Sequence, residues 1–222
     1  EKQYASLRKS LQTPKLEAKP TVDDLKKLAE SNPESFAVQM QLGMALHQAK
    51  DPKGAIQALE RASKLAPTAT GDNNPNKMIA AIAAESKDTT RQIQALEELL
   101  KVDSADIESA RQLATLLAPL KDDRRSEEAY RRVVGIDPFD RDAQANYGRL
   151  AVKRKDKDAA QRAFPAALAS NPPDRATAHV DLAEANVAAG RPAEAKKEVL
   201  AALEIAPSFE RAQDLLLKVA QP

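Results

Sequence analysis

The sequence contains no cysteine and no tryptophan, and aromatic residues make up only 3% of its 222 residues. The lack of cysteine excludes disulfides, thiolate catalysis and zinc sites built on thiolates, and it leaves the redox compartment undecided. No apolar run reaches the roughly 18 residues that a membrane-spanning helix needs. An excess of one charge is also missing, because 34 Lys and Arg face 33 Asp and Glu. This balance excludes general attraction to nucleic acid or to an anionic membrane as the main role of the protein.

Groups that carry catalysis or bind metals are equally scarce. His47 and His179 are the only histidines, and the His-Glu-x-x-His pattern of zinc hydrolases does not occur. The six glycines are dispersed and form no phosphate-binding loop. Carboxylate pairs such as Glu127-Glu128 are expected on exposed helix faces. We therefore predict no catalytic residue, no metal ligand and no cofactor, and a protein that is not an enzyme.

The residues that are present favour helices. Ala, Leu, Lys, Glu and Gln dominate the sequence, and all of them have high helix propensity. Apolar residues recur at helical spacing, for example within 38–49 and 96–102, and no strand-like alternation persists. The 42% of apolar residues is enough to build a core. The sequence therefore predicts an all-α fold.

Proline interrupts the helical stretches at a regular interval. Positions 33, 67, 138, 172 and 207 are prolines that follow helical stretches, and Ser104 holds the corresponding place in the remaining unit. The successive intervals are 34, 37, 34, 34 and 35 residues, and a loop over 68–75 accounts for the longer one. Because proline lacks the backbone N–H that continues a helix, it marks the end of each unit. The spacing predicts repeated units of about 34 residues.

A helix pair of this length resembles the tetratricopeptide repeat (TPR). The Leu-Gly pair of the TPR motif falls on Leu42-Gly43, Ile79-Ala80, Leu113-Ala114, Tyr147-Gly148 and Leu182-Ala183. The bulky residue of its second helix falls on Leu59, Leu96, Tyr130, Phe164 and Val199. The motif's tryptophan is replaced by Gln39, Asn76, Ala110, Gln144 and His179. The small residues of the first helices are expected where a neighbouring helix approaches closely, so that a larger side chain would overpack the contact.

The resemblance implies a right-handed superhelical solenoid of antiparallel helix pairs. We expect residues 1–20 to form an N-terminal helix, linker or tail, and residues 21–209 to form the repeat array. Within the array, 21–32 is the second helix of a leading unit, followed by units 36–69, 73–106, 107–140, 141–174 and 176–209. Residues 210–222 are expected to form a C-terminal capping helix.

The turns inside the units carry helix-starting signals. Asp51-Pro52 and Arg191-Pro192 place proline at the first turn of a second helix, where its fixed φ is favourable. Lys87-Asp88, Asp122-Asp123 and Lys155-Asp156 place capping carboxylates in the corresponding turns.

In proteins with TPR folds, the first helices line a concave face that holds peptides or partner helices. The groove-facing positions of the motif predict a partner-binding surface on this face. Its expected residues are Met40, Gln41, Met44, His47, Lys77, Arg111, Gln112, Asn146, Arg149 and Lys153. The methionines suit adaptable apolar contacts, and Arg111 or Arg149 is expected to bind a partner's carboxylate.

The leading functional hypothesis is a non-catalytic interaction module that binds a protein or peptide partner, with no role for nucleic acid or membrane. An alternative is an accessory or oligomerisation domain of a larger, enzymatic protein, because the chain begins at Glu1 and 13–20 resembles a linker. A third hypothesis is homo-oligomerisation through the terminal helices. The sequence predicts a soluble protein, cytoplasmic or exported, and identifies no partner.

Overall fold

The computed structural model describes residues 20–220, which form α-helices and two short 3-10 segments without any strand in that range. The predicted helix of residues 1–20 lies outside the described residues, apart from Pro20. The chain divides into two compact units, with the boundary between Ser109 and Ala110. Unit 1 contains α2 (Val22–Ser31), α3 (Phe36–Gln48), α4 (Pro52–Leu65), the 3-10 segment Gly71–Asn73, α5 (Pro75–Glu85) and α6 (Thr89–Val102). The helix α7 (Ile107–Leu117) begins in the last residues of unit 1 and continues into unit 2.

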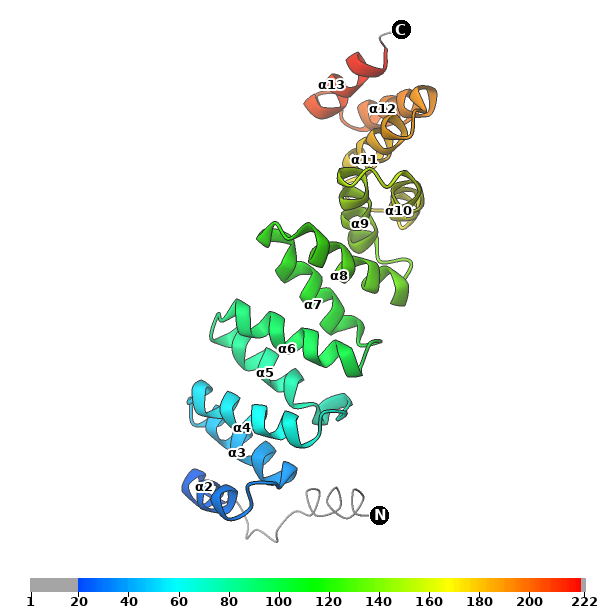
Figure 1. Ribbon diagram of the computed structural model, residues 1–222. Helices are drawn as coiled ribbons and strands as arrows, with labels where there is room; N and C mark the ends of the chain where they lie inside the picture. The colour runs from blue at the N-terminus through cyan, green and yellow to red at the C-terminus, as the bar shows by residue number, and fades with distance from the viewer. Residues whose placement is uncertain (1–19, 221–222) are drawn as a thin grey trace, which may run out of the picture. The chain divides into compact units, whose positions relative to one another are not determined.

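Unit 2 starts within α7 and contains the 3-10 segment Ala118–Leu120 and six further helices. These are α8 (Asp123–Ile136), α9 (Arg141–Lys153), α10 (Lys157–Ala169), α11 (Arg175–Ala188), α12 (Pro192–Ile205) and α13 (Glu210–Val219). Helices adjacent in the chain pack against each other as antiparallel pairs, most extensively α3 with α4, α5 with α6, α9 with α10 and α11 with α12 (Figure 1). We call the first member of each pair a first helix and the other a second helix.

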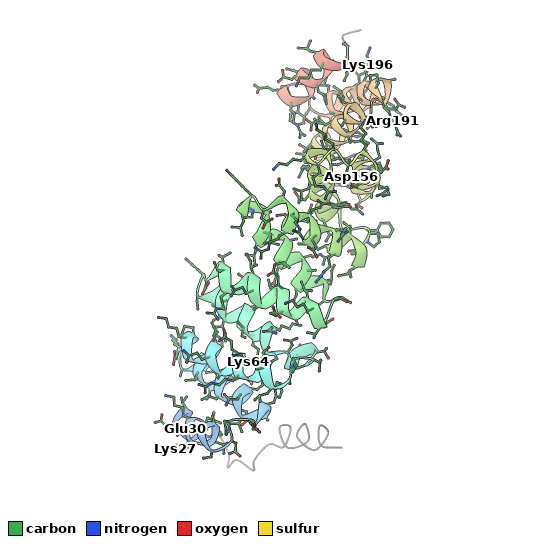
Figure 2. All side chains as sticks on the ribbon, in the orientation of Figure 1. Lys27, Glu30, Lys64, Asp156, Arg191 and Lys196 are labelled. Carbon is green, nitrogen blue, oxygen red and sulfur yellow. The ribbon has the colours of Figure 1, made fainter. Side chains whose placement is uncertain are left out.

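The two kinds of helix bury different parts of their surface. The first helix α11 buries seven residues around much of its circumference, because α9, α10, α12 and α13 all pack against it. The second helix α12 buries only Ala195, Val199 and Ala202 on one stripe. Charged side chains such as Lys64 of α4 and Lys196 of α12 lie on the outer faces of the second helices (Figure 2). This difference follows from the stacking of helix pairs, in which a first helix contacts more neighbours.

Two glycines confirm the predicted close approach between the helices of a pair. A Cβ atom on Gly43 would lie 2.7 Å from Cγ of Leu59, and one on Gly148 would lie 2.8 Å from the ring of Phe164. Both distances are well below van der Waals contact. The bulky second-helix residue therefore occupies the space that the glycine leaves.

The turns inside the pairs repeat one backbone conformation. The lysines Lys50, Lys87, Lys121 and Lys155 have φ between 57° and 63°, and Gly190 has φ of 76° at the same place in its pair. This left-handed conformation costs a lysine about 1–2 kcal/mol, whereas glycine adopts it freely. In the four lysine turns, the next residue is an aspartate whose carboxylate accepts a hydrogen bond from the backbone N–H three residues further on. The predicted capping carboxylates are therefore confirmed.

Glutamine at the tryptophan position of the motif has a structural role. The side-chain Nε2 of Gln144 donates to the backbone carbonyl of the proline six residues earlier, at 2.8 Å. Gln213 of α13 makes the same bond at 2.8 Å, and Gln39 makes it at 3.5 Å. Each glutamine ties the start of its helix to the preceding turn. Because α13 makes the same bond, its start resembles the starts of α3 and α9 in this respect.

Candidate partner-binding surface

A basic side chain on a first helix is paired with the aspartate at the start of the next first helix. In unit 1, Nζ of Lys77 in α5 lies 3.5 Å from Oδ2 of Asp106, just before α7. In unit 2, Nε of Arg111 in α7 donates to Oδ2 of Asp140, the N-cap of α9, at 2.6 Å. Both pairs are separated by 29 residues in the chain. The side chains of Asp106 and Asp140 are only 12% and 11% exposed, so these ion pairs are part of the packing between neighbouring repeats.

Asp106 shows the electrostatic effect of this arrangement. Burial alone would raise the pKa of its carboxyl group, but a hydrogen bond from the Ser109 N–H and the positive charge of Lys77 outweigh burial. The pKa of Asp106 is therefore lowered, and the carboxylate stays charged at neutral pH.

A second network joins α9, α11 and α13 of unit 2. Asp181 of α11 is 1% exposed, and Arg149 of α9 donates to its Oδ2 from Nε at 2.9 Å and from Nη2 at 2.6 Å. Arg211 of α13 donates to the other oxygen of Asp181 at 2.7 Å and also binds Glu184. The hydrogen bond to Glu184, followed by the one to Asp181, raises the pKa of the Arg211 guanidinium despite its partial burial. Two arginines thus neutralise two carboxylates between the helices.

The predicted surface residues of unit 2 are mostly engaged in such contacts. Arg111 also donates to Asp137 at 3.0 Å, and Lys153 forms an ion pair with Asp123 of α8. Asn146 accepts from Arg149 and donates to the backbone carbonyl of Asp142, whereas Gln112 is exposed. A partner carboxylate at Arg111 or Arg149 would therefore have to displace a carboxylate that is already bound.

The predicted residues of unit 1 are placed differently. Met40 is 8% exposed and belongs to the core, so it offers little surface to a partner. Met44 is 40% exposed, Gln41 is partly buried, and Nε2 of His47 lies 3.6 Å from Oε2 of Glu85 at the end of α5. Lys77 is shared between Asp106 and Asp72. The structure therefore leaves Met44 as the accessible apolar side chain of this set.

One expectation about the acidic residues is wrong. Glu127 is buried, and its carboxylate lies 2.9 Å from Nη1 of Arg154, at the end of α9. The pattern within α8 alone predicted an exposed residue, because it did not include the neighbouring helix that covers Glu127.

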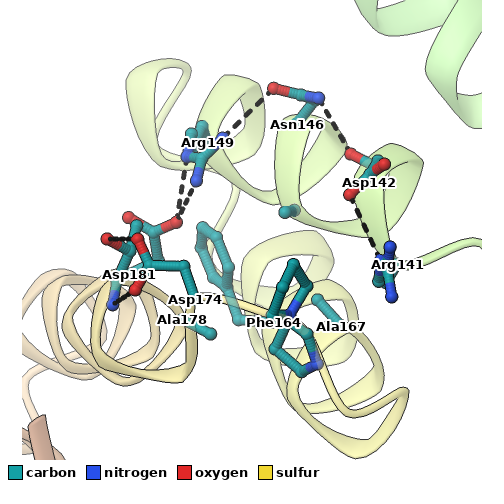
Figure 3. Close-up of a pocket in the computed structure, with 13 residues that line it drawn as sticks. Arg141, Asp142, Asn146, Arg149, Phe164, Ala167, Asp174, Ala178 and Asp181 are labelled. Carbon is teal, nitrogen blue, oxygen red and sulfur yellow. Dashed lines mark hydrogen bonds and ion pairs between the residues drawn. The ribbon is translucent and has the colours of Figure 1, made fainter. Parts of the chain in front are cut away.

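A pocket of about 240 Å³ opens in unit 2 between α9, α10 and α11 (Figure 3). Its apolar lining comes from Ala145, Phe164, Ala167, Ala178 and the prolines of the turn before α11. Its polar lining comes from Arg141, Asp142, Asn146, Arg149, Asp174 and Asp181, with Thr177 beside them. The pocket therefore combines an apolar lining with charged groups of both signs.

A second cavity, of about 600 Å³, lies in unit 1 between α4, α5 and α6. It is lined by the ion pair of Arg91 with Glu60, by Ile79 and Ala95, and by polar residues of the two second helices. None of these residues was predicted as a contact from the sequence, because the motif directs attention to the first helices.

The aspartates at positions 106, 140 and 174 were also missed at the level of the sequence. Their spacing of 34 residues follows the repeat, and the basic residues Lys77 and Arg111 have the same spacing. This periodicity is visible in the sequence, but its meaning depends on which helices are neighbours.

Comparison with known proteins identifies the family. The sequence model of the tetratricopeptide repeat family matches residues 22–70 and 146–208. The chain therefore belongs to the TPR family, and the predicted all-α helical repeat fold is confirmed. A comparison with curated proteins found no match.

Solved structures with a similar fold are TPR proteins with low sequence identity. YrrB, described as a TPR protein with an unusual peptide-binding site, is 16% identical with a TM-score of 0.57, and the match covers 87% of this chain and 98% of YrrB. MamA is 18% identical with a TM-score of 0.52, over 86% of this chain and 98% of MamA. The APC/C hetero-tetramer Cut9-Hcn1 is 17% identical with a TM-score of 0.50, over 90% of this chain and 39% of the matched chain. At these identities the likeness establishes the fold.

Within residues 20–220, no helix combines the length and apolar character that crossing a membrane requires. The same residues contain no group of three or more His, Asp or Glu side chains arranged to hold a metal ion.

Proposed function

We propose that the chain is a non-catalytic interaction module that binds a peptide or a segment of a partner protein along its first helices. TPR proteins are generally interaction scaffolds, and the related fold of YrrB carries a peptide-binding site. The observation that carries the proposal for this chain is the pocket between α9 and α11. Two of the predicted contact residues, Asn146 and Arg149, line this pocket, which has a volume of about 240 Å³.

The ion pairs define what kind of recognition this surface supports. Arg111, Arg149 and Lys153 are held by carboxylates of unit 2, so they stabilise the packing of neighbouring repeats. Binding that depends on these cations would have to overcome their existing interactions. Recognition through the pocket and through exposed polar groups such as Gln112 has no such cost.

We further propose that the described helices form the repeat units predicted from the sequence. The pairs α3/α4, α5/α6, α9/α10 and α11/α12 support units 36–69, 73–106, 141–174 and 176–209. The glutamine of α13 supports its relation to the first helices, so α13 would cover the end of the array as half of a further pair.

Selection from a library of random peptides tests the function and does not require a known partner. Peptides selected on the immobilised chain of residues 1–222 are added to the chain in solution, and amide hydrogen exchange is measured. We expect protection in α9 and α11, and less change in α10 and α12. Protection confined to the second helices would refute the proposal.

A pair of matched variants distinguishes peptide binding at the pocket from a general effect of an added positive charge. Asn146→Arg adds a bulky cation at the pocket and should weaken binding, whereas Ala169→Arg adds the same side chain at an exposed position of α10. Equal affinity of the two variants for the selected peptides would contradict binding at the pocket.

A further inference from the structure

The pocket of unit 2 lies where the repeated ion pair is interrupted. Lys77 pairs with Asp106 and Arg111 pairs with Asp140, each across 29 residues. The same spacing joins position 145 to Asp174, the N-cap of α11, but position 145 is alanine. Ala145 and Asp174 both line the pocket. The space that Lys77 and Arg111 fill in the two preceding units is therefore open here.

Among the charged residues that line the pocket, Asp174 is the carboxylate that forms no ion pair, and the hydrogen bonds from Thr177 and, less strongly, the positive charge of Arg149 lower its pKa. Arg141 lies 3.6 Å from its neighbour Asp142, and Arg149 is bound to Asp181. Among residues 20–220, only Thr177 donates hydrogen bonds to Asp174, at 2.9 Å from its backbone N–H and 2.7 Å from its hydroxyl. Within the described part of the chain, no basic group lies within ion-pair distance of it, and Asp174 is exposed, unlike Asp106 and Asp140.

We infer that this pocket receives a lysine or arginine side chain of the bound partner, with the carboxylate of Asp174 as its counter-charge. The inference rests on the proposed function and specifies its partner as a basic peptide segment. The aliphatic part of the side chain would lie on the apolar lining made by Ala145, Ala178 and the prolines before α11, and the charged end would reach Asp174. The partner thus completes an ion pair that the two preceding units make internally.

A double-mutant cycle tests the open cation position without any partner. In the chain of residues 1–222, Ala145→Arg should raise the Tm by about 2 °C, because it adds the ion pair that Lys77 and Arg111 make in the two preceding units. The gain should disappear when Asp174→Asn is also present, since asparagine keeps the helix cap but removes the charge. Ala145→Leu controls for the added apolar volume. An equal gain in Tm with and without the Asp174→Asn substitution would overturn the assignment of this position.

A titration then tests the ligand chemistry. The probes are the capped peptide acetyl-Ala-Gly-Lys-Gly-Ala-amide and its counterpart with norleucine, which keeps the aliphatic chain and lacks the charge. Binding is followed by backbone amide chemical shifts in the nuclear magnetic resonance spectrum of the full chain. We expect the lysine peptide to shift the amides of Ala145 and Thr177, and the norleucine peptide to bind about tenfold more weakly.

Three variants make this titration decisive. Asp174→Asn should weaken binding of the lysine peptide about tenfold, and Ala145→Arg should abolish it. Asp51→Asn removes one negative charge at a comparable helix cap in unit 1 and should leave binding unchanged. Equal binding of the two peptides, or shifts confined to the cavity between α4 and α6, would overturn the inference.

The outcomes also separate this inference from the proposed function. Library peptides that protect α9 and α11 without requiring a basic residue would refute the inference and leave the interaction module standing. Failure of every peptide to protect the first helices would refute the proposed function. The coupling between positions 145 and 174 is measured by Tm and does not depend on peptide binding.

Discussion

The substitution Gly148→Ala tests the packing within the pair α9/α10. The added Cβ would lie 2.8 Å from Cε1 and Cζ of Phe164, and Phe164 is 2% exposed within the core of α9, α10 and α11. The ring would have to move by about half an ångström or more to restore van der Waals contact. Overpacking of this kind costs about 1–3 kcal/mol, whereas replacing glycine by alanine inside a helix returns up to about 1 kcal/mol. We therefore expect a net loss of stability of up to about 2 kcal/mol.

Gly135→Ala is the matched control, because a Cβ at Gly135 of α8 would meet no atom within 4 Å apart from its chain neighbours and the nearby backbone of its own helix. It should stabilise the chain by about 0.5–1 kcal/mol. Urea unfolding followed by far-UV circular dichroism measures both variants, and Phe164→Leu in the Gly148→Ala background should recover part of the loss. If the two alanine variants are equally stable, close packing at Gly148 does not limit the size of the side chain there, and the expected overpacking is refuted.

Three further predictions concern charges and turns. Asp181→Asn should lower the free energy of unfolding by about 2–3 kcal/mol, because the buried carboxylate accepts hydrogen bonds from two arginines. Urea unfolding measures this loss, and an unchanged free energy of unfolding would contradict a structural role for the network. Gly190→Ala should destabilise the folded chain by about 1 kcal/mol, because φ of Gly190 is 76°, whereas Lys121→Gly should not destabilise it. Thermal unfolding compares the two variants, and a lower Tm for Lys121→Gly than for Gly190→Ala would refute the turn assignment. Since the pKa of Asp106 is lowered in the folded chain, its contribution to stability is complete above the unfolded pKa of about 4 and is lost as pH falls through the folded value. Unfolding measured against pH should show a smaller acid-side loss for Asp106→Asn, and an unchanged profile would contradict the lowered pKa of Asp106.

The repeat period, the helices and the close contacts could be predicted from the sequence because each depends on local chemistry. Proline at the end of a unit prevents the preceding helix from continuing, because it lacks the backbone N–H. Aspartate caps the helix that follows it, as Asp156 does for α10. A glycine opposite Phe164 leaves room for its ring. These signals lie within one unit of about 34 residues and do not require knowledge of the neighbouring unit.

The state of the charged residues could not be predicted in the same way. Arg149 meets Asp181 across 32 residues, and Arg111 meets Asp140 across 29, so each pairing depends on how neighbouring repeats are aligned. The motif positions alone placed these arginines on a binding surface and did not show that carboxylates already hold them. The burial of Met40 has the same origin, because a position on a helix is exposed only if no neighbouring helix covers it.

The most direct test of the account is a crystal structure of the full chain bound to a peptide selected from the library. We predict that the peptide lies along α9 and α11, with a lysine or arginine side chain in the pocket beside Asp174. A peptide bound to the exposed faces of α10 and α12, or only in the cavity between α4 and α6, would contradict it.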